Sequence, residues 1–155
     1  MLTISIDGCT EKNEEILFEA LLNKVDKFTI SSAGLIQSES ILKQPKLWFK
    51  NQGLGELDFA VDSDHLISEI RSSGDIILAG ESRKMDFLTT SSGDLRAFNL
   101  ICDTLVLNIY GSSVCDIYVN QHLEVNFFSN GRVNYRGNPE SIVVNGEGQI
   151  LESSI

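Results

Sequence analysis

The sequence predicts an all-β fold: a parallel β-helix (β-solenoid) of about six to seven short coils, with one α-helix inserted near the N-terminus. Two observations lead to this prediction. Short turns of small residues recur at nearly regular intervals, and runs of alternating apolar side chains separate them. The turns fall at Gly34, Gly55, Gly74, Gly93, the stretch 111–115, Gly131 and Gly148. A period near 20 residues is typical of solenoid proteins.

Each coil has one apolar stripe before its turn and a second stripe after it. Two residues after the turn glycine stand Ile36, Leu57, Ile76, Leu95, Val133 and Ile150, and Ile117 is assigned to the same place in the coil that follows the 111–115 turn. Apolar residues also dominate the positions four and six residues before the glycine. Because alternate side chains of a strand share a face, these positions are expected to point inwards. Stacked coils would then hydrogen-bond to each other at a spacing of about 4.8 Å.

Two segments depart from the repeat. Residues 11–24 (EKNEEILFEALLNK) begin with Asn13 and two acidic residues, which suit a helix N-terminus, and continue with a broad apolar face. We expect an amphipathic helix there, which either covers a sheet edge or binds a partner. The last coil has no evident capping element, so its edge could pair with another chain or be continued by further sequence.

Composition limits the class of protein and the kind of partner. With 155 residues, 42% of them hydrophobic, the chain can form a single domain over residues 1–155, either complete or as a fragment of a longer protein. A net charge of -10 disfavours nucleic acid and anionic membranes. No signal peptide or membrane span is recognisable, so the chain is either cytoplasmic or has lost a leader, and no direct membrane insertion is expected.

The three cysteines, Cys9, Cys102 and Cys115, are widely separated and lack CxxC spacing. This pattern favours buried apolar side chains over a zinc site or a disulfide framework. We therefore expect no metal and no cofactor.

Several turn segments resemble one known family: SSGDI (72–76), SSGDL (91–95), GSSVCDIYV (111–119), YRGNP (135–139) and GEGQI (146–150). They are similar to the serial turns and the penultimate Gly-Asn-Pro segment of the putative auto-transporter adhesin head GIN domain family. The resemblance is best over residues 66–152 and looser over 25–65. It implies a β-helix in an exported, cell-envelope, surface or secreted protein of Bacteroidetes-type bacteria, with an adhesive role and no catalytic residues.

Four acidic residues follow the turns at a shared offset. Glu56, Asp75 and Asp94 stand one position after a turn glycine, and Asp116 is assigned to the same place in the next coil. In stacked coils they would form a ladder of carboxylates, in which neighbours about 4.8 Å apart repel by roughly 1 to 3 kcal/mol. Such a ladder is either solvated or binds a cation or a cationic partner.

Catalytic signals are weak. The densest titratable cluster is the segment 62–65 (Asp-Ser-Asp-His), which is expected to be a polar loop, and His122 has no motif context. Trp48, Tyr110 and Phe128 are expected to be exposed, where they could stack on sugar rings.

Three functions remain open. The first is a non-enzymatic binding or adhesion module that presents a rigid face to a surface glycan or protein. The second is a structural module that forms homo-oligomers through its terminal coil edges. The third is a carbohydrate-active β-helix enzyme.

Overall fold

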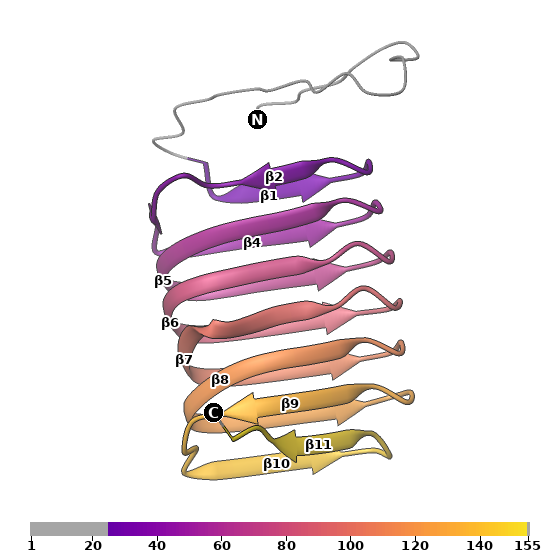
Figure 1. The fold of residues 1–155 in the computed structure, drawn as a ribbon. Helices are drawn as coiled ribbons and strands as arrows, with labels where there is room; N and C mark the ends of the chain where they lie inside the picture. The colour runs from indigo at the N-terminus through magenta and orange to yellow at the C-terminus, as the bar shows by residue number, and fades with distance from the viewer. Residues whose placement is uncertain (1–24, 155) are drawn as a thin grey trace.

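The computed structural model describes residues 25–154, which form a parallel β-solenoid of about seven turns (Figure 1). The predicted all-β solenoid is confirmed. The described part contains strands and no helix. The helix expected at 11–24 lies outside the described residues.

The strands belong to one continuous sheet that winds around the solenoid axis. They are β1 (Lys27–Ile30), β2 (Leu35–Gln37), β3 (Leu42–Lys43), β4 (Lys46–Asn51), β5 (Glu56–Ile70), β6 (Ile76–Thr89), β7 (Leu95–Ile109), β8 (Val114–Phe127), β9 (Arg132–Arg136), β10 (Ser141–Asn145) and β11 (Gln149–Glu152). Every pairing between them is parallel.

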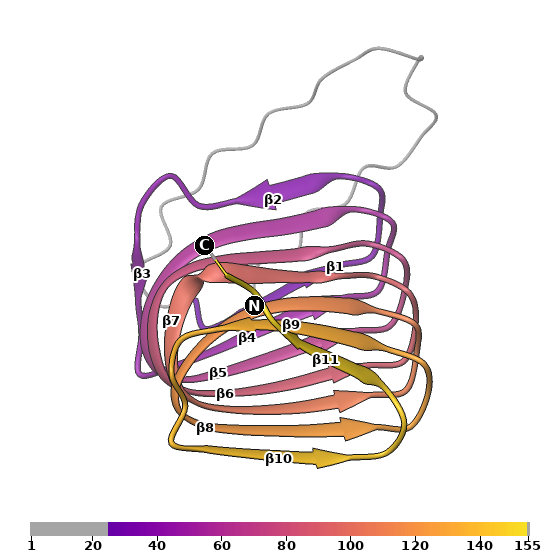
Figure 2. The same ribbon diagram turned by 60° about the horizontal axis from the view of Figure 1, so that its bottom comes forward.

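Each of the long strands β5 to β8 supplies two sides of its coil, because it bends at a corner near its middle (Figure 2). We call the outer surface of the segments that precede the glycine turns the pre-turn face. It comprises β1, β4, the second halves of β5 to β8, and β10. The outer surface of β2, the first halves of β5 to β8, β9 and β11 is the post-turn face.

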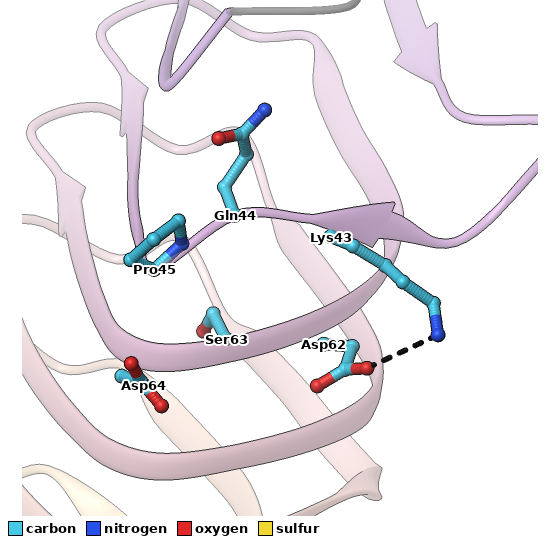
Figure 3. A pocket seen from close by; sticks show the side chains of 6 residues that line it. All are labelled: Lys43, Gln44, Pro45, Asp62, Ser63 and Asp64. Atoms are coloured by element: carbon cyan, nitrogen blue, oxygen red, sulfur yellow. Dashed lines mark ion pairs between the residues drawn. The ribbon is translucent and has the colours of Figure 1, made fainter.

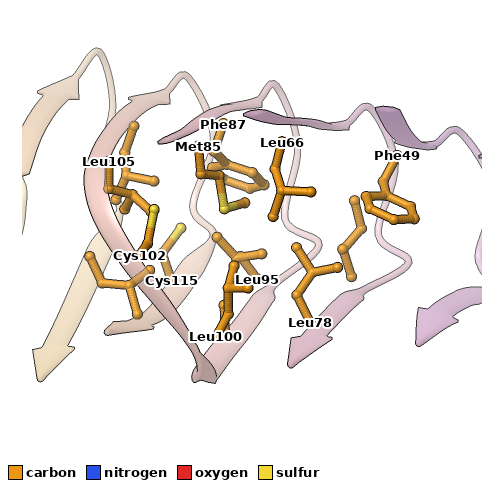
Figure 4. Close-up of a cluster of buried hydrophobic side chains, with 14 of the residues drawn as sticks. Phe49, Leu66, Leu78, Met85, Phe87, Leu95, Leu100, Cys102, Leu105 and Cys115 are labelled. Carbon is orange, nitrogen blue, oxygen red and sulfur yellow. The ribbon is translucent and has the colours of Figure 1, made fainter. Parts of the chain in front are cut away.

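The core is a set of apolar rows that run along the axis. Leu57, Ile76, Leu95, Cys115 and Val133 are paired in this order through successive coils and are fully buried. Figure 4 shows such side chains packing between the two walls of the coil. At the N-terminal end the rings of Phe28, Phe49 and Phe59 pack together with centroids 4.6 to 5.5 Å apart.

One position in this row differs from the sequence prediction. Cys115, not Ile117, pairs with Leu95, and Ile117 pairs with Ala97. The reason is that β8 begins at Val114, so the turn ends earlier than the 111–115 stretch suggested. A shift of two residues preserves the alternation of faces, and Ile117 is therefore still buried.

The turn glycines align along the axis where the coils approach most closely. A Cβ atom on Gly74 would lie 2.2 Å from the Gly55 carbonyl oxygen, and one on Gly93 would lie 2.2 Å from the Gly74 carbonyl oxygen. Both distances are shorter than any real contact. Glycine at these corners is thus required by the backbone of the preceding coil.

Asn51 binds two coils together inside this corner. Its buried Nδ2 donates to the carbonyl oxygens of Gly55 (2.7 Å) and Asp75 (3.0 Å), and its Oδ1 accepts from the Gly53 N–H (3.0 Å). The side chain therefore satisfies backbone groups of its own turn and of the next one, in a place that the two adjacent coils fill with Ile30 and Ile70.

We predict that Asn51→Ala lowers the free energy of unfolding by at least about 2 kcal/mol, because it leaves buried backbone groups without partners. Urea unfolding followed by circular dichroism measures this loss. The control is Asn134→Ala, which removes one outward bond to Asp116 and should cost less than about 1 kcal/mol. Similar losses for the two variants would contradict this role for Asn51.

Candidate functional site

The acidic row is present in part. The pairing of Leu57 with Ile76, and of Ile76 with Leu95, places the preceding residues Glu56, Asp75 and Asp94 in successive coils. Asp116 does not continue this row. It pairs with Arg96, and Val114 occupies the position next to Asp94. The assignment of Asp116 to the ladder was wrong for the same reason as that of Ile117: the turn before β8 is shorter than the sequence suggested.

The carboxylates of this region bind the next coil. Asp75 Oδ1 accepts from the Asp94 N–H (2.9 Å), and Asp94 Oδ1 accepts from the Val114 N–H (2.8 Å). Arg96 forms an ion pair with Asp75 (2.8 Å). Backbone donors and one guanidinium thus offset the repulsion that the sequence implied. Whether the row also binds a cation or a partner stays a prediction, and the described residues contain no group of three or more His, Cys, Asp or Glu that could hold a metal ion.

The segment 62–65 is not the polar loop that the sequence suggested: it lies within β5, at the corner of the coil, and its backbone continues the pairing with β6. It lies beside a pocket of about 280 Å³ (Figure 3). The pocket is lined by Lys43, Gln44, Pro45, Asp62, Ser63 and Asp64. Asp62 pairs with Lys43 (3.4 Å) and Asp64 with Arg83 (2.7 Å). His65 instead pairs with Asp86 (2.6 Å) on the pre-turn face. The cluster therefore separates: Asp62 and Asp64 form exposed ion pairs, each worth about 0 to 1 kcal/mol, and His65 forms a hydrogen bond with Asp86.

Two of the cysteines are buried thiols, as the sequence predicted. Desolvation by burial raises the pKa of Cys102 to about 12 and raises the pKa of Cys115 further still. Both side chains are therefore neutral and packed in the core at ordinary pH. Cys9 lies outside the described residues.

An exposed aromatic pair stands at the edge of the pre-turn face. The rings of Tyr110 and Phe128 stack with centroids 4.1 Å apart and an interplanar angle of 2°. They follow β7 and β8 directly, and half or more of each residue is exposed. Trp48 is a separate exposed aromatic on this face, flanked by the ammonium groups of Lys27 and Lys46.

A ladder of asparagines runs beside the aromatic pair. Asn126 Nδ2 donates to Asn108 Oδ1 (3.1 Å), and Asn145 Nδ2 donates to Asn126 Oδ1 (2.8 Å). Asn126 Nδ2 also donates to Glu124 Oε1 (3.0 Å). Asn108 on β7 and Asn126 on β8 each stand two residues before an aromatic residue, Tyr110 or Phe128, and point outwards with it.

We call Asn108, Tyr110, Glu124, Asn126 and Phe128 the aromatic–asparagine site. Its side chains combine apolar ring surface with amide and carboxylate groups, held in place by the ladder and by the sheet. Sequence reasoning singled out the two rings but missed the amides. The available signal was that Asn108 and Asn126 share the same offset from Tyr110 and Phe128.

Comparisons with known proteins point to binding proteins. The model of the family described as "putative auto-transporter adhesin, head GIN domain" matches residues 2–139. The crystal structure of a "putative lipid binding protein" from Parabacteroides distasonis ATCC 8503 is similar, with a TM-score of 0.73 and 25% sequence identity. The similarity covers 81% of this chain and 53% of the Parabacteroides protein, so this chain spans about half the length of that protein.

No curated protein matches the chain. In the described part of the chain, no helix is long and apolar enough to cross a membrane.

We predict that Asp94→Ala lowers the free energy of unfolding by about 1 kcal/mol, because the Val114 N–H loses its acceptor. Asp94→Asn is the matched control, since it removes the charge and keeps the oxygen that accepts this bond. Urea unfolding should show Asp94→Asn close to the parent protein. If Asp94→Asn instead loses as much as Asp94→Ala, the charge itself, or a cation bound to it, matters more than the hydrogen bond.

Proposed function

The chain belongs to the putative auto-transporter adhesin, head GIN domain family, and from this premise we propose that it is a non-enzymatic binding module of the bacterial cell envelope whose pre-turn face binds a glycan. The observation that supports this proposal is the aromatic–asparagine site. Glycan binding is chosen over protein binding because the site pairs ring surface with amide and carboxylate groups in a small area.

The chemistry of the site suits sugars. Aromatic rings offer flat apolar surface to the C–H faces of a sugar ring, and the amide and carboxylate groups of Asn108, Asn126 and Glu124 can hydrogen-bond to hydroxyl groups. Tyr110 and Phe128 already stack on each other, so the remaining ring face of Phe128 and the ring edges are open to a ligand. Because the sheet and the ladder hold these groups in place, little conformational entropy is lost on binding.

Lipid binding, which the description of the similar structure suggests, has less support in this chain. An acyl chain requires an apolar cavity. The corner pocket is lined mainly by charged and polar side chains, and a second pocket near the C-terminus is lined by Tyr118, Arg136, Gly137, Glu152, Ser153 and Ser154.

We predict that Phe128→Ala weakens glycan binding by about tenfold or more, since stacking on an aromatic ring contributes on the order of 1 kcal/mol and the replacement also removes apolar contact area. A glycan array identifies a ligand, and calorimetry with that ligand measures the change in Kd. Tyr110→Ala should act in the same direction.

The matched control is Leu54→Ala, which removes another strongly exposed apolar side chain at a distant turn and should leave Kd unchanged. Binding by the parent protein to phospholipid vesicles and to no glycan would contradict the proposal. So would a Phe128→Ala protein that binds its glycan as tightly as the parent does.

A second candidate function, assembly through the C-terminal coil, is favoured by a separate observation. Ile142 and Val144 of β10 pair with Leu123 and Val125 of β8, which are fully buried. Ile142 and Val144 are nevertheless 41% exposed, because β10 and β11 form the last described coil. The open apolar end and its unpaired strand edges are suited to stacking against a second copy of the chain.

For this candidate we predict that the protein self-associates with increasing concentration and that Val144→Lys shifts it to monomers, because a charge would be buried at the contact. Sedimentation velocity over a concentration series measures both effects. Val143→Lys is the control, since Val143 lies on the same strand with 42% exposure but on the opposite side. A parent protein that is monomeric at every concentration would contradict self-association.

A further inference from the structure

Arg136, the last residue of β9, has a guanidinium group without a polar partner. Most Lys and Arg side chains in the described residues pair with carboxylates, such as Arg96 with Asp75 and Arg83 with Asp64. Arg136 forms no ion pair, and its Nε is buried with no hydrogen-bond partner. Leaving a buried polar atom of a charged group without a partner is strongly unfavourable. Native structures rarely leave such an atom without a ligand, an ion or a water molecule.

The guanidinium group is held in a fixed orientation. Its Cζ lies 4.0 Å from the centroid of the Phe98 ring, which is a favourable cation–π distance. Phe98 belongs to an irregularity in β7, where the register shifts between Ala97 and Ile101. Tyr118 belongs to β8, which lies between β7 and β9, and it pairs with Arg136.

A pocket of about 310 Å³ opens beside this arginine, on the post-turn face near the C-terminal end. Tyr118, Arg136, Gly137, Glu152, Ser153 and Ser154 line it. Gly137 has a φ of 97°, and a Cβ atom there would lie 2.1 Å from the Val119 carbonyl oxygen. Glycine is therefore needed for the backbone that follows Arg136 at the wall of this pocket.

We propose that this pocket is a binding site for an oxyanion, in which Arg136 holds a carboxylate or a phosphate group. A guanidinium group presents its N–H donors in a planar fork that matches such groups, and stacking on Phe98 fixes this plane before the ligand arrives. The Ser153 and Ser154 hydroxyls and the Tyr118 phenol add neutral donors. The oxyanion would supply the partner that Arg136 Nε lacks.

The negative charge of Glu152 should lower the affinity of this site for an anion. It lines the same pocket without forming an ion pair with Arg136, and its side chain is exposed. A negative charge at this edge opposes the entry of an anion, so the affinity should depend on its charge. The site lies on the opposite wall of the coil from the aromatic–asparagine site, and the proposal does not depend on glycan binding there.

The test is a titration of the full chain, followed by the NMR signals of the Arg136 side-chain Nε–H and of the backbone amides of residues 118, 136, 137 and 153. The probes are sodium glucuronate for a carboxylate, inorganic phosphate for a phosphate group and glucose as a neutral control, all at constant ionic strength. We expect saturable shifts with one or both anions and none with glucose. A response to glucuronate alone would identify an acidic sugar as the ligand class, and a response to phosphate alone would identify a phosphorylated one.

Variants separate a built site from general charge attraction. Arg136→Ala should weaken anion binding by about tenfold or more, and Glu152→Gln should tighten it severalfold. Arg132→Ala is the matched control, because Arg132 lies on the same strand, is exposed and donates to Gln149 rather than to a carboxylate. It should leave the affinity unchanged.

Two results would overturn the proposal. One is the absence of saturable shifts with either anion, which would mean that water alone satisfies Arg136. The other is an equal loss of affinity in Arg136→Ala and Arg132→Ala. If Arg136→Ala fails to fold, Glu152→Gln decides the matter, since unchanged affinity in this surface variant would also contradict the proposal.

Discussion

The structure depends on one constraint: each coil hydrogen-bonds to the coils before and after it in parallel register, so equivalent residues lie directly above one another about 4.8 Å apart. A side chain therefore meets copies of its own position on both sides. Apolar residues form continuous rows in the interior, and glycine recurs at the corners where backbones nearly touch. Few other arrangements would tolerate the same sequence period.

The same constraint decides how polar residues are used. A polar group inside the coil has to find its partners in the adjacent turn, as Asn51 does with Gly55 and Asp75. Acidic residues at the turn exits accept from the backbone N–H of the next coil, and this explains how like charges stand in neighbouring rungs. On the outer surface, the register places asparagines of successive coils next to each other, so that they form a hydrogen-bonded ladder. It brings Tyr110 and Phe128 together in the same way, as a stacked pair.

Much of the fold could be predicted from the sequence, because both the turn period and the alternation of apolar residues follow from stacking. The prediction failed where the alternation of apolar residues could not reveal the register between coils. A shift of two residues leaves the inward and outward faces unchanged, so the sequence could not decide between Cys115 and Ile117, and Asp116 was assigned to the wrong row. Residues 98–100 of β7, just before Ile101, have no partner on β8, and this became visible only from the pairing with the neighbouring strand. On the other side of β7, Asn99 and Leu100 pair with Ala79 and Gly80 of β6.

The candidate sites were less predictable than the fold. Exposed aromatic residues could be named from the sequence, but their value depends on the amides beside them, and these become neighbours only through register. Arg136 gave no signal, because its lack of a partner is a property of its surroundings. Function in such a protein thus resides in rows and edges of the surface rather than in a motif.

Spin-label distances test the in-register stacking most directly. One outward row of the pre-turn face contains Thr29, Asn108, Asn126 and Asn145. In the register, Asn108, Asn126 and Asn145 lie four, five and six coils from Thr29, respectively. Each double-labelled protein carries one label at Thr29 and one at another of these positions, in a Cys9→Ser background. The Cα–Cα separations expected for the three pairs are near 19, 24 and 29 Å. The measured distances between the two labels should therefore have narrow distributions and rise by about 4.8 Å per coil. Broad distributions, or distances that do not rise by this constant step, would contradict the stacked solenoid.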